Sequence, residues 1–162
     1  MQPVPATLCH LDTVLDIVQG TIQAIYPAYY PQGAIEFFLD YHAREAIGKA
    51  IERGEVYLFE EGGEFVATGS REGDYLTRLF VLPRHQGKGI GSRVMDFLEA
   101  QVFQEYDEAR LDASLPAVEL YLKRGYIIAA YRRERTFRDH YLCYMDMRKR
   151  RPDCLMTPGA HE

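Results

Sequence analysis

The amino-acid sequence predicts a single α/β domain, and three observations support this prediction. The chain has 162 residues, which suits one domain, since domains usually contain about 100 to 200 residues. Apolar residues recur at helical spacing in some segments and at strand spacing in others, and the two patterns alternate along the chain. No internal repeat or low-complexity linker interrupts them. We therefore expect residues 1–162 to form one domain, with a mobile tail from about residue 148.

Two helices are predicted in the first third of the chain. The first has apolar residues three and four positions apart between Leu11 and Ile25, and it ends at Pro27, which cannot continue a helix. The second begins near Pro31 and ends at Gly54. The apolar positions that share one face of this second helix are Ile35, Phe38, Leu39, His42, Ala46, Ile47 and Ala50.

The rest of the chain is predicted to alternate strands with two more helices. Residues 56–59 and 65–68 flank a Gly-containing turn and indicate a hairpin, and residues 75–82 supply a third strand. A helix follows, with Ile90, Val94 and Val102 on its apolar stripe. Residues 109–113 predict a strand and 116–124 a short helix that ends at Gly125. Residues 126–131 and 141–147 predict a final antiparallel pair.

Composition and charge exclude several classes of protein. A net charge of −5 argues against a general nucleic-acid binder, and the basic run 148–151 is interpreted as a solvated end. Cys9, Cys143 and Cys154 lack paired C-x-x-C spacing, so we expect reduced thiols and no metal site. The sequence has neither a signal-peptide pattern nor an apolar run long enough to cross a membrane. We therefore expect a cytoplasmic protein without nucleic-acid or membrane partners.

A glycine-rich turn between the third strand and the following helix predicts an anion site. Gly87, Gly89 and Gly91 alternate along it, and the basic residues Arg84, Lys88 and Arg93 accompany them. Glycines let the main chain approach an anion, while the free N–H groups and the dipole of the next helix favour negative charge. This turn is therefore expected to bind phosphate.

The kind of phosphate ligand is narrowed by comparison with known loops. The nucleoside-triphosphate pattern G-x-x-x-x-G-K-[ST] fails because Leu82 stands at its first glycine. The dinucleotide pattern G-x-G-x-x-G fails because its last position is Ser92 or Val94. Residues 86–91, Gln-Gly-Lys-Gly-Ile-Gly, instead resemble Q/R-x-x-G-x-G/A, the pyrophosphate loop of the GCN5-related N-acetyltransferases (GNATs).

A second segment strengthens this resemblance. Residues 117–126, Ala-Val-Glu-Leu-Tyr-Leu-Lys-Arg-Gly-Tyr, resemble the family's A-x-x-L-Y-x-K-x-G-F/Y segment, which presents a tyrosine near the thioester sulfur. The similarity is sharp over residues 76–126. It implies a GNAT-type fold, with a mixed, mostly antiparallel central sheet flanked by helices. It also implies acetyl-coenzyme A as cosubstrate and direct transfer of its acetyl group to a primary amine in a ternary complex.

The resemblance assigns roles to residues of this chain. The pantetheine arm would pair with Leu79, Phe80 and Val81, and an N–H near Phe80 or Val81 would stabilise the oxyanion. Tyr121 would be the catalytic group that faces the departing thiolate. Ser114 stands where many family members have a cofactor-contacting asparagine, and Lys123 lies within possible reach of the nucleotide phosphates. The residues expected to hold the pyrophosphate are Gln86, Gly87, Lys88, Gly89, Ile90, Gly91 and Ser92.

This chain departs from the family pattern at the position of the general base. Many relatives have a glutamate on the fourth strand where this chain has Thr77. An alkyl amine with a pKa of about 10.4 is almost entirely protonated at pH 7, so a proton must be removed. A water chain could serve, and so could one of four side chains: Glu72, Asp74, Asp112 and His140.

The acceptor is expected to be a small-molecule amine or a peptide, bound by the first two helices and the last hairpin. Glu36 or Asp40 could attract a cationic amine, whereas His42 and His85 are not expected to be catalytic. Two alternatives stay open: a transferase of larger acyl groups or of protein amines, and a non-catalytic acyl-coenzyme A sensor. We expect a monomer or a homodimer paired through an edge strand. The aromatic residues that could line the acceptor pocket are Tyr26, Tyr29, Tyr30, Phe37, Phe38 and Tyr41.

Overall fold

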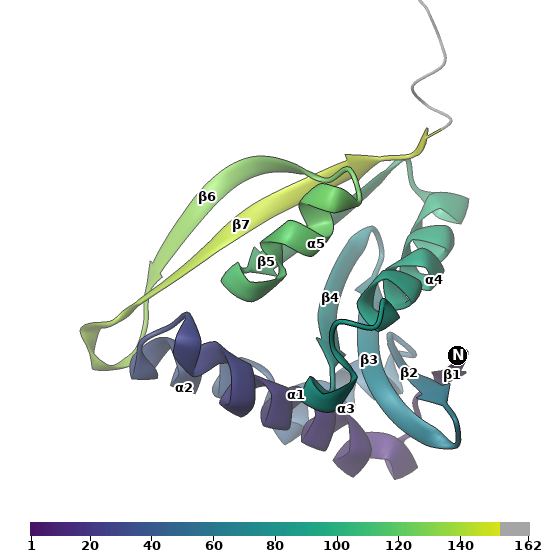
Figure 1. The fold of residues 1–162 in the computed structure, drawn as a ribbon, viewed down its shortest axis with the longest axis horizontal. Helices are drawn as coiled ribbons and strands as arrows, with labels where there is room; N and C mark the ends of the chain where they lie inside the picture. Colours follow the sequence, from purple (N-terminus) through teal and green to yellow (C-terminus); the bar gives the residue numbers. More distant parts are fainter. Residues whose placement is uncertain (153–162) are drawn as a thin grey trace, which may run out of the picture.

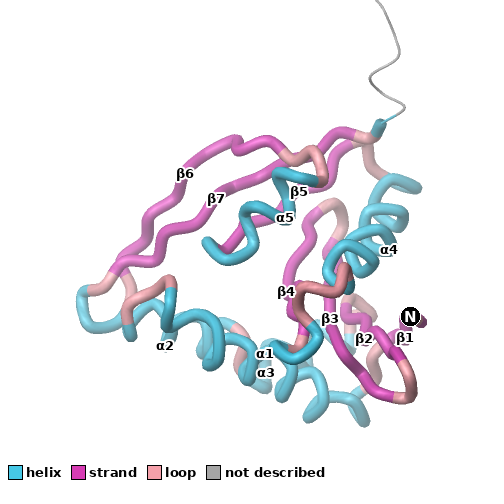
Figure 2. The backbone as a smooth tube through the Cα atoms, viewed as in Figure 1, coloured by secondary structure: helices cyan, strands magenta, loops and turns pink. Residues whose placement is uncertain are grey.

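The computed structural model describes residues 1–152. It confirms a mixed α/β domain with a seven-stranded sheet in the order β1-β2-β3-β4-β5-β7-β6 (Figures 1 and 2). Its strands are β1 (Gln2–Pro5), β2 (Val56–Glu61), β3 (Glu64–Glu72), β4 (Tyr75–Val81), β5 (Glu108–Ser114), β6 (Ile127–Arg135) and β7 (Tyr141–Arg150). Its helices are α1 (Leu11–Ile25), α2 (Gln32–Tyr41), α3 (Arg44–Glu52), α4 (Ile90–Glu105) and α5 (Val118–Lys123).

The two halves of the sheet separate between β4 and β5. All neighbouring strands are antiparallel except this pair, which is parallel. The pair is joined through only two partner positions, Tyr75 with Arg110 and Leu76 with Leu111. Beyond Leu76 the strands diverge, as Figure 1 shows. The later residues of β4 therefore have a free backbone edge.

A β-bulge interrupts β4 at the point of divergence. Thr68 pairs with Phe80 and Ser70 with Thr77, so Arg78 and Leu79 together oppose one residue of β3. Arg78 has a φ of 53°, in the left-handed region that only a small share of non-glycine residues adopt. Such a bulge redirects side chains next to the site of disruption.

Two hydrophobic cores lie on opposite faces of the sheet. Helices α1, α2 and α3 pack on one face, with Val18, Ile47 and Phe80 among the buried residues. Helices α4 and α5 pack on the other, with Val94, Leu98 and Tyr121. Because side chains alternate along a strand, β4 contributes to both cores and connects the two layers.

The expected second helix is in fact two helices, which corrects the sequence-based prediction. Helix α2 ends at Tyr41, His42 has a non-helical ψ of 35°, and Ala43 is extended before α3 begins. No glycine or proline marks this break. His42 is only 5 % exposed, so tertiary burial at the corner, which local sequence does not encode, accompanies the change of direction.

Two other boundaries differ from expectation. Strand β1 was not predicted, because Pro3 and Pro5 disfavour strands; it is an edge strand, where a missing N–H is tolerated. Strand β7 continues to Arg150, past residue 148, at about which the tail was expected to start. The remainder of that tail, residues 153–162, and Cys154 lie outside the described residues. Within residues 1–152, none of the helices has the length and apolar character needed to cross a bilayer.

Candidate active site

The glycine turn adopts the conformation that its sequence predicts. Gly87 and Gly89 have φ angles of 73° and 75°, and Gly89 is the N-cap of α4. A Cβ atom at either glycine would meet nothing within 4 Å. The left-handed backbone, and not a lack of room, therefore requires glycine here. The first N–H groups of α4 have no partner within the helix, and Ile90, Gly91 and Ser92, which carry them, line a cavity.

The expected cofactor residues line one cavity of about 360 Å³. Lys88 is the exception: its ammonium group donates to the carbonyl oxygen of Arg84 at 3.1 Å and does not reach the cavity. His85 lines the cavity as well, and its Nε2 lies 3.1 Å from a carboxylate oxygen of Glu64. The expected residues that the structure brings together are Leu79, Phe80, Val81, Gln86, Gly87, Gly89, Ile90, Gly91, Ser92 and Ser114.

Hydrogen-bond geometry distinguishes the two candidate oxyanion donors. The N–H of Leu82 donates to the carbonyl oxygen of Val66 at 2.9 Å. Successive residues of an antiparallel strand alternate in facing their partner strand. The N–H of Val81 therefore points away from β3, into the opening beside β5, whereas that of Phe80 points toward β3. The carbonyl of Val81 is held on the same edge by the Gln86 side chain at 3.0 Å.

A second cavity, of about 310 Å³, adjoins the first. The two share Tyr26, Leu79, Phe80, Ser114 and Ala117, so they meet beside the free edge of β4. The hydroxyl of Tyr26 donates to Ser114 Oγ at 3.0 Å and fixes this junction. Burial raises the pKa of Tyr26 to about 12, and the hydrogen bond to Ser114 opposes that shift.

Tyr121 lines the second cavity from α5. The side chain is 6 % exposed, and its ring packs edge-on against Tyr126 with 5.6 Å between ring centroids. Burial raises the pKa of Tyr121 well above its ordinary value, and the nearby Arg124 opposes this shift. The hydroxyl therefore keeps its proton and can act as a hydrogen-bond donor.

The structure brings only one of the four candidate bases into either cavity. Asp112 lines the second cavity and accepts a hydrogen bond from the Tyr75 hydroxyl at 2.8 Å. Desolvation raises the pKa of this carboxyl group although the side chain is exposed on one side. Nearby Asp146 raises the pKa further, whereas the Tyr75 hydrogen bond and Arg132 lower it. Asp112 is therefore a carboxylate whose environment favours accepting a proton.

The other three candidates lie outside both cavities. Asp74 forms an ion pair with Arg110 at 2.7 Å, and this pair lowers the pKa of Asp74. Glu72 ends β3. His140 Nδ1 accepts a hydrogen bond from the N–H of Gly33 at 2.9 Å, which docks the β6–β7 hairpin on α2. Of the four candidates, Asp112 is therefore the one that the structure places on a cavity wall.

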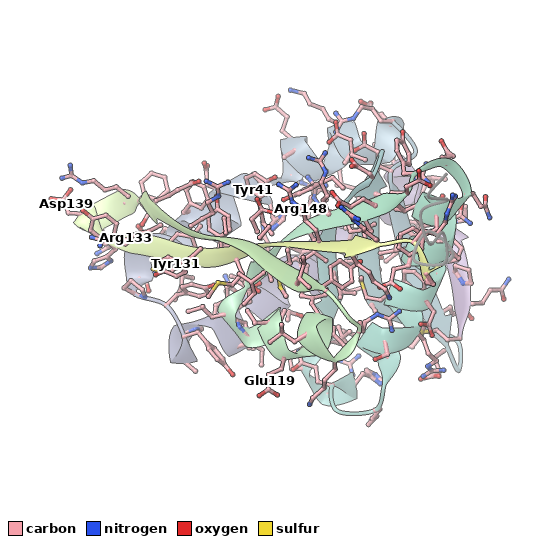
Figure 3. The ribbon with its side chains drawn as sticks, turned by 90° about the horizontal axis from the view of Figure 1, so that it is seen from above. Tyr41, Glu119, Tyr131, Arg133, Asp139 and Arg148 are labelled. Atoms are coloured by element: carbon pink, nitrogen blue, oxygen red, sulfur yellow. The ribbon has the colours of Figure 1, made fainter. Side chains whose placement is uncertain are left out.

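The aromatic residues expected at the acceptor divide into two sets. Tyr26, Phe37, Phe38 and Tyr41 line the second cavity; Figure 3 labels Tyr41. Tyr29 and Tyr30 do not line it. Tyr29 is half exposed, and the hydroxyl of Tyr30 accepts from the N–H of Leu115 at 2.7 Å and donates to the carbonyl of Cys143 at 3.1 Å.

Glu36 and Asp40, the two acidic residues expected to attract an amine, do not line the second cavity. Glu36 forms an ion pair with Arg138, which lowers the pKa of Glu36 and further fastens the hairpin to α2. Asp40 is absent from the cavity wall. The carboxylates that do line it are Asp112 and Glu134, which accepts from the Tyr144 hydroxyl at 2.6 Å.

Sequence reasoning did not find Arg78 or Glu134 and set His42 aside, yet all three line the second cavity. His42 was interpreted as a residue on the face of a continuous helix. Arg78 sits on the bulge of β4, and Glu134 on a strand predicted to end at residue 131. Among residues 1–152 no group of three or more metal-binding side chains occurs.

Comparisons with known proteins place the chain in a family. The Acetyltransferase (GNAT) domain matches residues 25–151. A GCN5-related N-acetyltransferase from Rhodopseudomonas palustris superposes with a TM-score of 0.82 at 20% identity, covering 93% of this chain and 95% of its own. PaiA N-acetyltransferase from Thermoplasma acidophilum, solved with coenzyme A, gives 0.70 at 16% identity, with 93% and 98% covered.

A third structure gives the same fold. It is a Salmonella typhimurium protein solved with acetyl-coenzyme A, with a TM-score of 0.64 at 14% identity, covering 100% of this chain and 98% of its own. No curated protein sequence matches the chain. Since the domain match extends over most of the chain and these structures share its architecture, the chain belongs to the GNAT acetyltransferase family.

Proposed function

We propose that this protein transfers the acetyl group of acetyl-coenzyme A to a primary amine by direct attack in a ternary complex. The observation that carries the proposal is the junction of the two cavities at the free edge of β4, where the Val81 N–H points in and Ser114 lies opposite. Similar structures were solved with coenzyme A or acetyl-coenzyme A, which agrees with a cosubstrate in the first cavity.

The first cavity fits a pyrophosphate. Glycines at 87 and 89 leave open space, and the N–H groups at the start of α4 supply partial positive charge. Lys88 is directed elsewhere, so the main chain would hold the anion. The bound cosubstrate supplies a thioester whose carbonyl carbon is the electrophile.

The residues at the junction have complementary tasks. The amine nitrogen attacks the thioester carbonyl, a C–N bond forms, the C–S bond breaks with its electron pair on sulfur, and the proton that the new amide nitrogen loses ends on that thiolate. The Val81 N–H would donate to the carbonyl oxygen as it gains charge. The Tyr121 hydroxyl would donate to the departing sulfur. Asp112 would take the ammonium proton through water, because its raised pKa makes it a better base than an ordinary aspartate.

The first test is thermal unfolding with acetyl-coenzyme A, free coenzyme A and adenosine diphosphate. A ligand at 100 times its Kd stabilises a protein by about 2.7 kcal/mol. For a domain of this size that raises Tm by about 5 to 10 °C. We expect acetyl-coenzyme A to produce such a shift and Gly89→Glu to abolish it. Absence of a shift with all three ligands would remove the basis of the proposal.

Gly54→Glu is the matched control for that variant. Gly54 also has a positive φ, of 71°, and open space around it, but it follows α3 and does not line either proposed cavity. Both variants introduce the same charge and backbone strain. Only Gly89→Glu should therefore lose the rise in Tm that acetyl-coenzyme A causes. Thiol release with a library of amines then separates an enzyme from a sensor, since a sensor is stabilised without turnover.

A further inference from the structure

The acceptor cavity contains an arginine that forms no ion pair with any described residue, although Glu55 and Glu72 attract its charge from a longer distance. Arg78 lines the cavity, and its Nε is buried without a hydrogen-bond partner. Among residues 1–152 no carboxylate lies within ion-pair distance of its guanidinium, whereas Arg53 and Arg110 are paired with Glu55 and Asp74. A largely desolvated guanidinium is costly unless an anion compensates it. The cavity therefore presents an unsatisfied cationic group.

His42 adds a second unsatisfied group to the same cavity. The side chain is 5 % exposed and its Nδ1 has no hydrogen-bond partner. Its ring is edge-on to Phe80 and Tyr41, with centroids 5.4 and 4.9 Å apart. Burial, reinforced by the charge of Arg78, lowers the pKa of His42 to about 3. The ring is neutral at physiological pH, and with its proton on Nδ1 that nitrogen can donate to an anion.

Another part of the cavity is acidic. Asp112 and Glu134 line it, and neither forms an ion pair with Arg78. Asp112 and Ser114 are two residues apart on β5 and so lie on one face of that strand. Ser114 borders the junction with the first cavity, so Asp112 lies close to the transfer site along β5. A cationic amine would bind beside this carboxylate.

We propose that the acceptor is a small amino acid, whose carboxylate is bound by Arg78 and whose amine lies at the acidic part of the cavity. This inference rests on the proposed acetyl transfer and specifies its substrate class. Tyr41 and Phe38 supply apolar walls of the same cavity. The docked hairpin leaves room for a small molecule. A protein amino terminus has no adjacent carboxylate and would leave Arg78 unpaired.

The binding test uses the protein saturated with coenzyme A. Melting temperatures are measured with the standard L-amino acids, β-alanine and 4-aminobutyrate, each compared with its amide. We expect at least one amino acid to raise Tm and its amide to do so at least about 10-fold less potently, since a charge-assisted bidentate contact is lost. Equal potency of acid and amide, or no stabilisation by any amino acid, would overturn the proposal.

Two aminophosphonates test whether the anion that Arg78 binds is a carboxylate or a phosphonate. Aminomethylphosphonate and 2-aminoethylphosphonate replace the carboxylate group by a phosphonate. Stabilisation by these compounds without stabilisation by any amino acid would reject the carboxylate assignment and identify a phosphate-type acceptor. The initial acetyl-coenzyme A shift is measured in the same series, so loss of the cosubstrate site is distinguished from a wrong acceptor class.

Substitutions of Arg78 test whether this residue causes the preference for an amino acid over its amide. Arg78→Gln should remove the difference between acid and amide, in Tm and in kcat/KM for thiol release, while retaining the acetyl-coenzyme A shift. Arg78→Lys should restore part of the preference. Arg44→Gln is the control, because Arg44 is an exposed α3 residue paired with Asp12 outside the cavity. An unchanged acid preference in folded Arg78→Gln would show that another group binds the carboxylate.

Discussion

Tyr121 combines burial with a place on the wall of the acceptor cavity. Removing its hydroxyl would take away the proposed donor to the sulfur without creating a large void. We expect Tyr121→Phe to lower kcat about 10- to 100-fold, the size of one hydrogen bond to a charged group, with little change in the Kd of acetyl-coenzyme A. Steady-state kinetics and calorimetry measure both. Tyr126→Phe removes a neighbouring buried hydroxyl outside the cavity, and an equal kcat loss there would contradict a specific role.

Asp112 has a raised pKa, and this has consequences for stability as well as for rate. A carboxyl group with a higher pKa in the folded state stabilises folding below its unfolded pKa of about 3.9. That contribution is lost as the pH rises through the raised value. At pH 7 the ionised Asp112 therefore disfavours folding. Because the side chain is exposed, we expect Asp112→Asn to raise the unfolding free energy only slightly, by less than about 0.5 kcal/mol.

The same substitution should remove the base. We expect kcat/KM of the wild type to rise with pH through an apparent pKa above that of an ordinary aspartate. In Asp112→Asn this rise of kcat/KM with pH should disappear. The value of kcat/KM at neutral pH should fall about 100-fold. A pH profile of the purified variant, beside its chemical denaturation curve, checks both expectations. If kcat/KM of the variant still rises with pH in the same range, the proton is transferred to water or to Glu134 instead.

At the scale of elements, the β6–β7 hairpin is fixed to α2 at its tip. The short turn η5 (Phe137–Asp139) lies at that tip, where Figure 3 labels Asp139. A Cβ on Gly33 would lie 1.9 Å from the carbonyl oxygen of Phe137, so α2 and the tip approach too closely for any other side chain. The hairpin contributes Glu134 and Tyr144 to the acceptor cavity. Its position therefore determines the shape of that cavity.

Gly33→Ala should displace this hairpin. We expect kcat/KM for the acceptor to fall about 10- to 100-fold, since small misplacements near a reacting group have effects of that size. The acetyl-coenzyme A shift should persist because the glycine loop belongs to β4 and α4. Gly20→Ala, at a helical glycine with nothing within 4 Å, is the control. Equal losses of acceptor and cosubstrate binding would mean that the variant disturbs the whole fold.

At the scale of the whole molecule, the two sheet halves share only two strand-pairing positions between β4 and β5. A cosubstrate in the opening would contact both halves. We expect acetyl-coenzyme A to slow hydrogen exchange of the Val81 amide, which points into the opening, and of the first N–H groups of α4. Two-dimensional NMR with and without ligand measures this. Unchanged exchange at Val81 despite stabilisation would place the pantetheine arm elsewhere.

Local sequence predicted much of this architecture because the decisive signals are contiguous. Alternating glycines before an amphipathic run predict a helix N-terminus, and α4 begins directly after Gly89. The first helix is confirmed at Leu11–Ile25, and a short 3-10 turn, Tyr26–Ala28, contains the Pro27 at which it was predicted to end. The break at His42 and strand β1 were missed, since burial and edge position, and not local propensity, determine them.

The sequence by itself determined the family, the glycine loop and the tyrosine of α5, because each depends on residues close together in the chain. Only the tertiary structure decided which of the candidate acids lines a cavity and that Arg78 and His42 share that cavity with it. Those residues come from β5, β4 and the corner between α2 and α3, far apart in sequence. Their meeting depends on strand order, a bulge and a docked hairpin, which are properties of long-range packing.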